Sequence, residues 1–189
     1  TDSEQDGEVY MGCAGGIDAN IRLAFEPTAV PTGYQALRLS VKGLRGGHSG
    51  VNIHQDRGKA NKLLARLLLT ASENVTLHLA QMEGGTLRNA IPREASALLW
   101  VAPDDVDALQ QQIAAHGALL QTELKEIDSF LEISLQAATA PAQAMDADLV
   151  APRRQLGAQA KVEAAGGERA EGVAQAADWL RDMARQQRA

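Results

Sequence analysis

The order in which two hydrophobic periodicities follow one another is the strongest constraint on the fold of this chain. Apolar and polar residues alternate, as in half-buried strands, in three segments: 37–41, 75–79 and 131–135. A further strand is expected over 95–101, which the Gly84-Gly85 turn and Pro92 separate from the strand before it. Between the first two alternating segments, apolar residues recur at the spacing of an amphipathic helix over 58–72. A second helix is expected to begin at Pro103 and to continue to Ile127, with Gly117 weakening its middle.

The resulting order is β-α-β-β-α-β, which predicts a ferredoxin-like α+β fold. In that fold one four-stranded antiparallel sheet is covered on one face by two helices. The open face and the sheet edges then need charges or a partner. Residues 8–30 are expected to add one or two short strands. The Ala-, Gln- and Gly-rich stretch 137–168 is typical of a linker, and 169–188 could form a terminal helix.

Composition narrows the class of protein. The chain has 189 residues, a formal net charge of −6 and no long basic run or aromatic-rich platform, which argues against a nucleic-acid binder. Its single cysteine, Cys13, cannot form an internal disulfide, which fits a cytoplasmic location, and a buried structural thiol is favoured over a nucleophile. No apolar run approaches the roughly 20 residues that span a bilayer. The chain begins inside a motif without methionine, so we expect a fragment of a longer protein.

Two glycine-containing segments carry the polar side chains best suited to binding. Gly46-Gly47-His48-Ser49-Gly50 presents an imidazole among small residues, and Thr86-Leu87-Arg88-Asn89-Ala90-Ile91-Pro92 presents an amide between a Gly-Gly turn and a proline. On loops held by a rigid scaffold, these two groups could form a polar clamp for a substrate. The alternative is that both segments are ordinary turns, in which His and Asn are common.

Four segments in the same order resemble a known family. They are 1–16 (beginning Thr-Asp-Ser-Glu), 41–50 (Val-Lys-Gly-Leu-Arg-Gly-Gly-His-Ser-Gly), 60–66 (Ala-Asn-Lys-Leu-Leu-Ala-Arg) and 84–94 (Gly-Gly-Thr-Leu-Arg-Asn-Ala-Ile-Pro-Arg-Glu). Together they resemble the bacterial aminoacyl-histidine dipeptidases, or peptidase D, which are zinc peptidases of the M20 type. The resemblance covers residues 1 to about 140. It corresponds to the end of a catalytic-domain segment and most of the inserted lid, or dimerisation, domain.

The resemblance implies roles for three residues. Asp2 matches a carboxylate that binds one of two zinc ions. His48 matches a lid histidine that reaches the partner subunit's active site and stabilises the oxyanion. Asn89 matches a lid asparagine that contacts the substrate. The other metal ligands and the general base of the family lie outside this chain, and the substrate-binding arginine of the lid is not evident.

The resemblance also implies a domain division and partners. Residues 1–34 would end a catalytic-domain segment and form a hinge, 35–140 would form the lid, and 141–189 remain unmatched. The intact protein would be a cytoplasmic zinc dipeptidase that cleaves Xaa-His dipeptides and pairs as a homodimer through its lid. One carboxylate cannot hold a catalytic zinc, which needs about three protein ligands. We therefore expect this chain alone to bind no stoichiometric zinc and to be inactive.

Several alternatives remain open at this stage. His54 and Asp56 could join His48 in a metal site, but they lie on a loop without a third ligand at the usual zinc spacing. Arg88 and Arg93 could bind a substrate carboxylate, although a structural role such as pairing with Glu94 is favoured. For the whole chain, the second hypothesis is a non-catalytic α+β dimerisation module.

Overall fold

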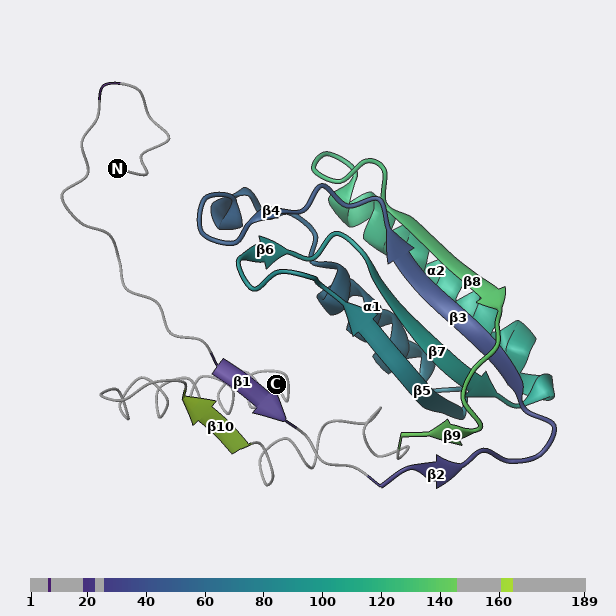
Figure 1. Ribbon diagram of the computed structural model, residues 1–189. Coiled ribbons are helices and arrows are strands. Elements are labelled where there is room, and N and C mark those ends of the chain that lie inside the picture. Colours follow the sequence, from purple (N-terminus) through teal and green to yellow (C-terminus); the bar gives the residue numbers. More distant parts are fainter. Residues whose placement is uncertain (1–6, 8–18, 23–25, 146–160, 165–189) are drawn as a thin grey trace. The chain divides into compact units, whose positions relative to one another are not determined.

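The computed structural model describes residues 7, 19–22, 26–145 and 161–164 (Figure 1). The chain divides into two compact units. One comprises residues 25–152, and the other comprises 1–24 together with 153–189. In the second unit, β1 (Ala19–Arg22) pairs antiparallel with β10 (Lys161–Ala164). His48 and Asn89 belong to the first unit, whereas Asp2 lies outside the described residues.

The larger unit is built on a four-stranded antiparallel sheet with two helices against one face, as Figure 1 shows. Its main elements are β3 (Gln35–Lys42), α1 (Ala60–Ala71), β5 (Leu77–Gly84), β7 (Ala95–Val101), α2 (Val106–Leu124) and β8 (Glu132–Ala137). The spatial order is β5-β7-β3-β8. Each helix therefore connects two strands that are not neighbours in the sheet. This arrangement confirms the predicted ferredoxin-like α+β fold.

The core lies between the sheet and its two helices. Leu39 of β3 and Leu99 of β7 are fully buried, and they meet fully buried leucines of the helices: Leu64, Leu67 and Leu109. Strand alternation directs every second side chain to this face. Leu37 of β3 lies opposite Leu99 of the neighbouring strand β7, so the row of apolar side chains continues from one strand to the next. No helix in the part of the chain that the structure describes is long and apolar enough to cross a membrane.

Shorter elements surround the sheet and differ from the sequence expectations. β2 (Thr28–Ala29) pairs with β9 (Gln143–Ala144), which lies in the stretch expected to be a linker. The N–H of Met145 donates to the carbonyl of Leu79 at 2.7 Å. β5 extends to Gly84, beyond the alternating segment. A bulge between Leu79 and Gln81 interrupts the alternation, so the sequence pattern ends before the strand does. The 3₁₀ helix η2 (Pro103–Asp105) precedes α2, which ends three residues before Ile127.

An ion pair joins the outer surfaces of the two helices. Arg66 of α1 donates two hydrogen bonds to the carboxylate of Glu123 of α2, at 3.0 and 2.9 Å. The hydrogen bond from Arg66 lowers the pKa of Glu123, and the same bond raises the pKa of Arg66. The two side chains are 45% and 52% exposed, so solvent screens most of their attraction.

We expect Glu123→Gln to destabilise the fold by about 0.2–1 kcal/mol at neutral pH, the range for exposed pairs. Because the pKa of Glu123 is lower in the folded than in the unfolded state, the stabilisation exists above the unfolded pKa. It is lost as the pH falls through the folded pKa. Urea unfolding at several pH values should therefore show the difference from wild type shrinking in acid. Glu126→Gln changes the same charge beside Lys125 and is the control; an equal, pH-independent effect in both variants would contradict the assignment.

Candidate functional site

The loops that carry His48 and Asn89 are joined by their backbones. β4 (Gly47–His48) pairs antiparallel with β6 (Ala90–Ile91), with His48 opposite Ala90. The N–H of Ser49 also donates to the carbonyl of Asn89 at 2.8 Å. Figure 1 shows this small ladder at one end of the main sheet. The structure thus brings the two predicted site residues together, and both of their side chains are exposed.

The imidazole of His48 is oriented by its own loop. Its Nδ1 accepts hydrogen bonds from the backbone N–H groups of Gly50 and Val51, both at 3.1 Å. A ring nitrogen that accepts hydrogen bonds carries no proton, so the neutral ring has its proton on Nε2. The loop therefore presents Nε2–H as a donor on an exposed side chain.

Two side chains that sequence reasoning missed hold the backbone of this loop. Asn52 Oδ1 accepts the N–H of His48 at 2.8 Å, while the N–H of Asn52 donates to the carbonyl of His48 at 2.9 Å. Arg57 donates to the carbonyl of Gly46 at 2.5 Å and to Gln55 Oε1. Asn52 and Arg57 carry no sequence signal for this function, because only the folded loop directs them at its own backbone.

The Asn89 loop is tied to the start of α1. The N–H of Ala60 donates to the carbonyl of Pro92 at 2.9 Å. Within the loop, the N–H of Ala90 donates to the carbonyl of Leu87 at 3.3 Å and closes a turn. Leu87 is 67% exposed, and in the His48 loop Val51 is 59% exposed. Both loops therefore combine a polar group with an apolar side chain that is open to a ligand or a partner.

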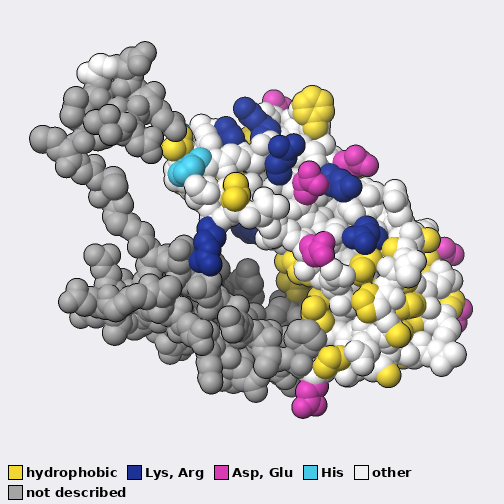
Figure 2. Space-filling model, viewed as in Figure 1, with side chains coloured by type: hydrophobic (Ala, Val, Ile, Leu, Met, Phe, Trp, Pro, Cys, Tyr) yellow, Lys and Arg dark blue, Asp and Glu magenta, His cyan; other side chains and the backbone are white. Residues whose placement is uncertain are grey.

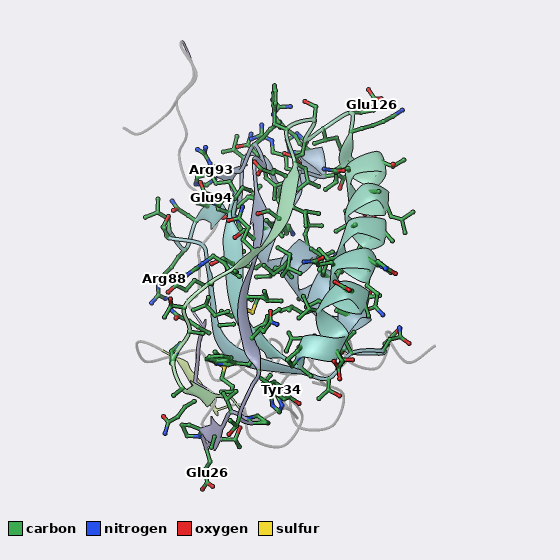
Figure 3. The ribbon with its side chains drawn as sticks, turned by 90° about the vertical axis from the view of Figure 1, so that its right-hand side faces the viewer. Glu26, Tyr34, Arg88, Arg93, Glu94 and Glu126 are labelled. Atoms are coloured by element: carbon green, nitrogen blue, oxygen red, sulfur yellow. The ribbon has the colours of Figure 1, made fainter. Side chains whose placement is uncertain are left out.

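Charged side chains of both signs lie at this end of the unit (Figure 2). Exposed Lys and Arg residues near the two loops are Lys42, Arg45, Lys59, Arg88 and Arg93. A Cβ added at Gly46 would lie 3.2 Å from Cβ of Arg93, so the stem of this arginine packs at the base of the His48 loop. Figure 3 shows Arg88, Arg93 and Glu94 on the side of the sheet away from α2. Exposed carboxylates of Asp56, Glu83, Glu94 and Glu132 lie in the same region, so the charge at this end is mixed.

The described residues offer no metal centre. Within them, no three His, Cys, Asp or Glu side chains come close enough to hold a metal ion, so His48, His54 and Asp56 do not form the site considered from the sequence. His54 lies in the 3₁₀ helix η1 (Ile53–Gln55), and Asp56 ends that helix with a φ of 51°. The ring of His78 instead lies tilted by 56° against the ring of Tyr34, with the two ring centroids 5.5 Å apart.

Comparison with known proteins identifies the class of domain. Residues 39–128 match the M20 peptidase dimerisation domain family. With its ferredoxin-like sheet and its joined loops, the larger unit is a peptidase dimerisation domain of the M20 type. The resemblance to M20 peptidases is thereby confirmed over a range that contains three of the four sequence motifs, 41–50, 60–66 and 84–94.

Two relatives refine this assignment. The cytosol non-specific dipeptidase of Escherichia coli (strain K12) is 50% identical over 135 residues, which are 71% of this chain and 28% of that protein. The crystal structure of an aminoacylhistidine dipeptidase from Vibrio alginolyticus matches with a TM-score of 0.71 at 43% identity, covering 77% of this chain and 30% of that one. This chain thus spans less than a third of either relative.

Asn52 and Arg57, which hold the backbone of the His48 loop, leave no room for a side chain at Gly47. Gly47 has a φ of +137°, and an added Cβ would overlap Arg57 and lie 2.7 Å from Asn52 Oδ1. Gly47→Ala should therefore displace Asn52 as well as strain the backbone, at a cost above the roughly 1–3 kcal/mol of strain alone. Gly33→Ala is the control, since Gly33 also has a positive φ but nothing lies within 4 Å. Urea unfolding should rank Gly47→Ala as the less stable variant. Equal losses of unfolding free energy in the two variants would show that Asn52 and Arg57 move aside at no cost.

Proposed function

We propose that this chain supplies the lid of a dipeptide-hydrolysing enzyme of the M20 type, in which His48 donates to the developing oxyanion. The observation that carries the proposal is the orientation of the ring, because two backbone amides hold Nδ1 as an acceptor and leave Nε2–H to donate. The joined loop with Asn89 supports a role for its amide in contacting the substrate backbone. Cleavage of dipeptides, including those that end in histidine, agrees with the names of both relatives.

The chemical contribution of His48 would be selective for the transition state. When a nucleophile attacks a peptide carbonyl, negative charge grows on the oxygen, and a preoriented N–H donor stabilises that charge more than the uncharged substrate. A fixed tautomer provides this donor without a reorganisation step.

The remaining machinery would come from residues outside the lid. M20 peptidases are generally metal-dependent, yet the described residues contain no cluster that could hold a metal ion. Zinc, if bound, would therefore be held elsewhere in the protein, with Asp2 proposed as one of its ligands. A carboxylate outside this chain would act as the base. The lid alone would not turn over substrate or retain stoichiometric zinc.

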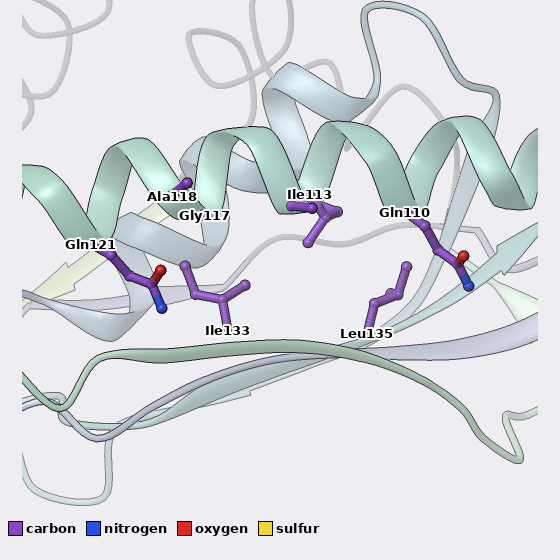
Figure 4. A pocket seen from close by; sticks show the side chains of 8 residues that line it. Gln110, Ile113, Gly117, Ala118, Gln121, Ile133 and Leu135 are labelled. Atoms are coloured by element: carbon purple, nitrogen blue, oxygen red, sulfur yellow. The ribbon is translucent and has the colours of Figure 1, made fainter.

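The proposed homodimer would form along the β8 edge of the lid. β8 pairs with β3 on one side only, and no other described strand pairs with it, so its second edge is open. Beside it, Figure 4 shows a groove between α2 and β8, lined by Ile113, Ala114, Gly117, Ala118, Ile133 and Leu135 with two flanking glutamines. Small side chains on α2 would let the helix of a second copy approach while β8 pairs with its equivalent.

A cytoplasmic location is part of the proposal, supported by the E. coli relative, which is called a cytosolic enzyme. The alternative of a purely structural dimerisation module is less favoured. Such a module would need the β8 edge but would not need an oriented histidine in a loop joined to Asn89.

His48→Ala should lower kcat about 10²–10³-fold in a full-length dipeptidase whose lid is exchanged for this one, because one oxyanion donor is lost. KM, zinc content and folding should change little, since the exposed ring is not part of the core. His54→Ala removes another exposed histidine of the same loop and should leave kcat near wild type. Steady-state kinetics on Xaa-His dipeptides would measure both variants. Equal activity of His48→Ala and wild type would exclude the oxyanion role.

Ala118→Glu should weaken self-association, because a twofold pairing at the groove would bring two added carboxylates together. Ala115→Glu is the matched control: Ala115 is also exposed on α2 but does not line the groove. Sedimentation equilibrium of the 189-residue chain should show dimers for wild type and Ala115→Glu, and mainly monomers for Ala118→Glu. Equal dimerisation of the two variants would place the interface elsewhere.

A further inference from the structure

Asp128 is a buried carboxylate whose two oxygens bind the backbone at the two ends of the His48 loop. Its side chain is 2% exposed, in the turn between α2 and β8. Oδ1 accepts the N–H of Arg45 at 2.7 Å, and Oδ2 accepts the N–H of Gly58 at 2.6 Å. Residues 46–57, which we call the site loop, lie between these two donors and include His48. One carboxylate thus closes the base of the site loop.

The backbone that carries this carboxylate is itself fixed. The N–H of Asp128 donates to the carbonyl of Leu124 at 2.7 Å, and the carbonyl of Asp128 accepts the N–H of Leu131 at 3.0 Å. These bonds continue α2 at one side and lead into β8 at the other. The carboxylate is therefore held by the backbone between α2 and β8, which both pack on the core. Its hydrogen bonds to Arg45 and Gly58 fix the site loop relative to these two elements.

The approach of Asp128 requires a residue without a side chain at position 58. A Cβ added at Gly58 would lie 3.1 Å from Asp128 Oδ2 and 2.7 Å from a methyl group of Leu44. Charged acceptors make shorter and stronger bonds to N–H groups than neutral ones do. A buried carboxylate that lost these donors would be left without hydrogen bonds in an apolar surrounding, which is unfavourable.

We propose that Asp128 is a positioning residue for His48. It fixes the base of the site loop, while the β4–β6 ladder holds Gly47 and His48 next to that base, so the ring that bonds to Gly50 and Val51 keeps one orientation relative to the sheet. The consequence for catalysis rests on the proposed oxyanion role of His48. The consequence for the orientation and tautomer of the ring does not, and it can be measured without any activity.

The test is NMR spectroscopy of the 189-residue chain with Asp128→Asn, which preserves shape but points an amide NH₂ at one of the two donors. We expect amide exchange of Arg45 and Gly58 to accelerate about tenfold or more, with sheet amides such as that of Leu39 unchanged. The ¹⁵N signals of the His48 ring should move from one tautomer toward the average of two. Asp104→Asn, the same change at an exposed aspartate of η2, should alter neither signal.

Faster exchange at Arg45 and Gly58 with unchanged ring signals would overturn the proposal and leave Asp128 a structural residue only. If Asp128→Asn does not fold, Gly58→Ala displaces the carboxylate from the other side and should produce the same change in the ring signals. Unchanged ring signals in that folded variant would also overturn the proposal. If the His48 ring signals change in Asp128→Asn but the His48→Ala enzyme remains active, the proposed catalytic role of His48 is rejected and the positioning role of Asp128 is retained.

Discussion

Packing of both helices against one face of the sheet is the constraint on which the other features of the unit depend. Leu39 and Leu99, in adjacent strands, are enclosed by leucines of α1 and α2. Burial of such side chains contributes about 1.5–3 kcal/mol each, the largest favourable term in a domain of this size. Because strands alternate, fixing this row of leucines also fixes the register of the sheet. The ends of the strands, and hence the loops, are positioned as a result.

Strand order then explains why the candidate site forms at one end of the sheet. β3 ends where β7 begins, with Val41 opposite Ala95, and β8 begins at the same end, with Lys42 opposite Glu132. Three connections must therefore meet there: the His48 loop after β3, the Asn89 loop before β7, and the turn with Asp128 before β8. Segments far apart in the sequence meet because the antiparallel order brings their strand ends together, and short backbone hydrogen bonds complete the contact.

The sequence predicted what depends on long, regular patterns. The helix α1 has an apolar repeat long enough to fix its type and nearly its ends, and the strand at 95–101 is an apolar run bounded by Pro92 and Pro103. The two-residue ladder of β4 and β6 is too short to have any periodicity. Asp128 was missed for a related reason: its bonds to Arg45 and Gly58 span 83 and 70 residues, so only tertiary folding reveals them. His48 and Asn89 were predicted as site residues from their glycine-containing surroundings and the resemblance to a family, and the structure adds that their loops adjoin.

The arrangement around His48 separates two requirements of the proposed lid. An oxyanion donor must be oriented before the reaction, since reorganising it during the reaction would raise the barrier. A lid residue must also be exposed, because it acts on a substrate held by other parts of the protein. A free surface loop meets the second requirement but not the first. Here Asn52 binds the backbone of His48, the amides of the loop bind its ring, and a buried carboxylate closes the base of the loop. The donor is thereby fixed within the lid while its Nε2–H stays exposed, so its approach to a reacting carbonyl would require movement of the whole lid rather than of the loop.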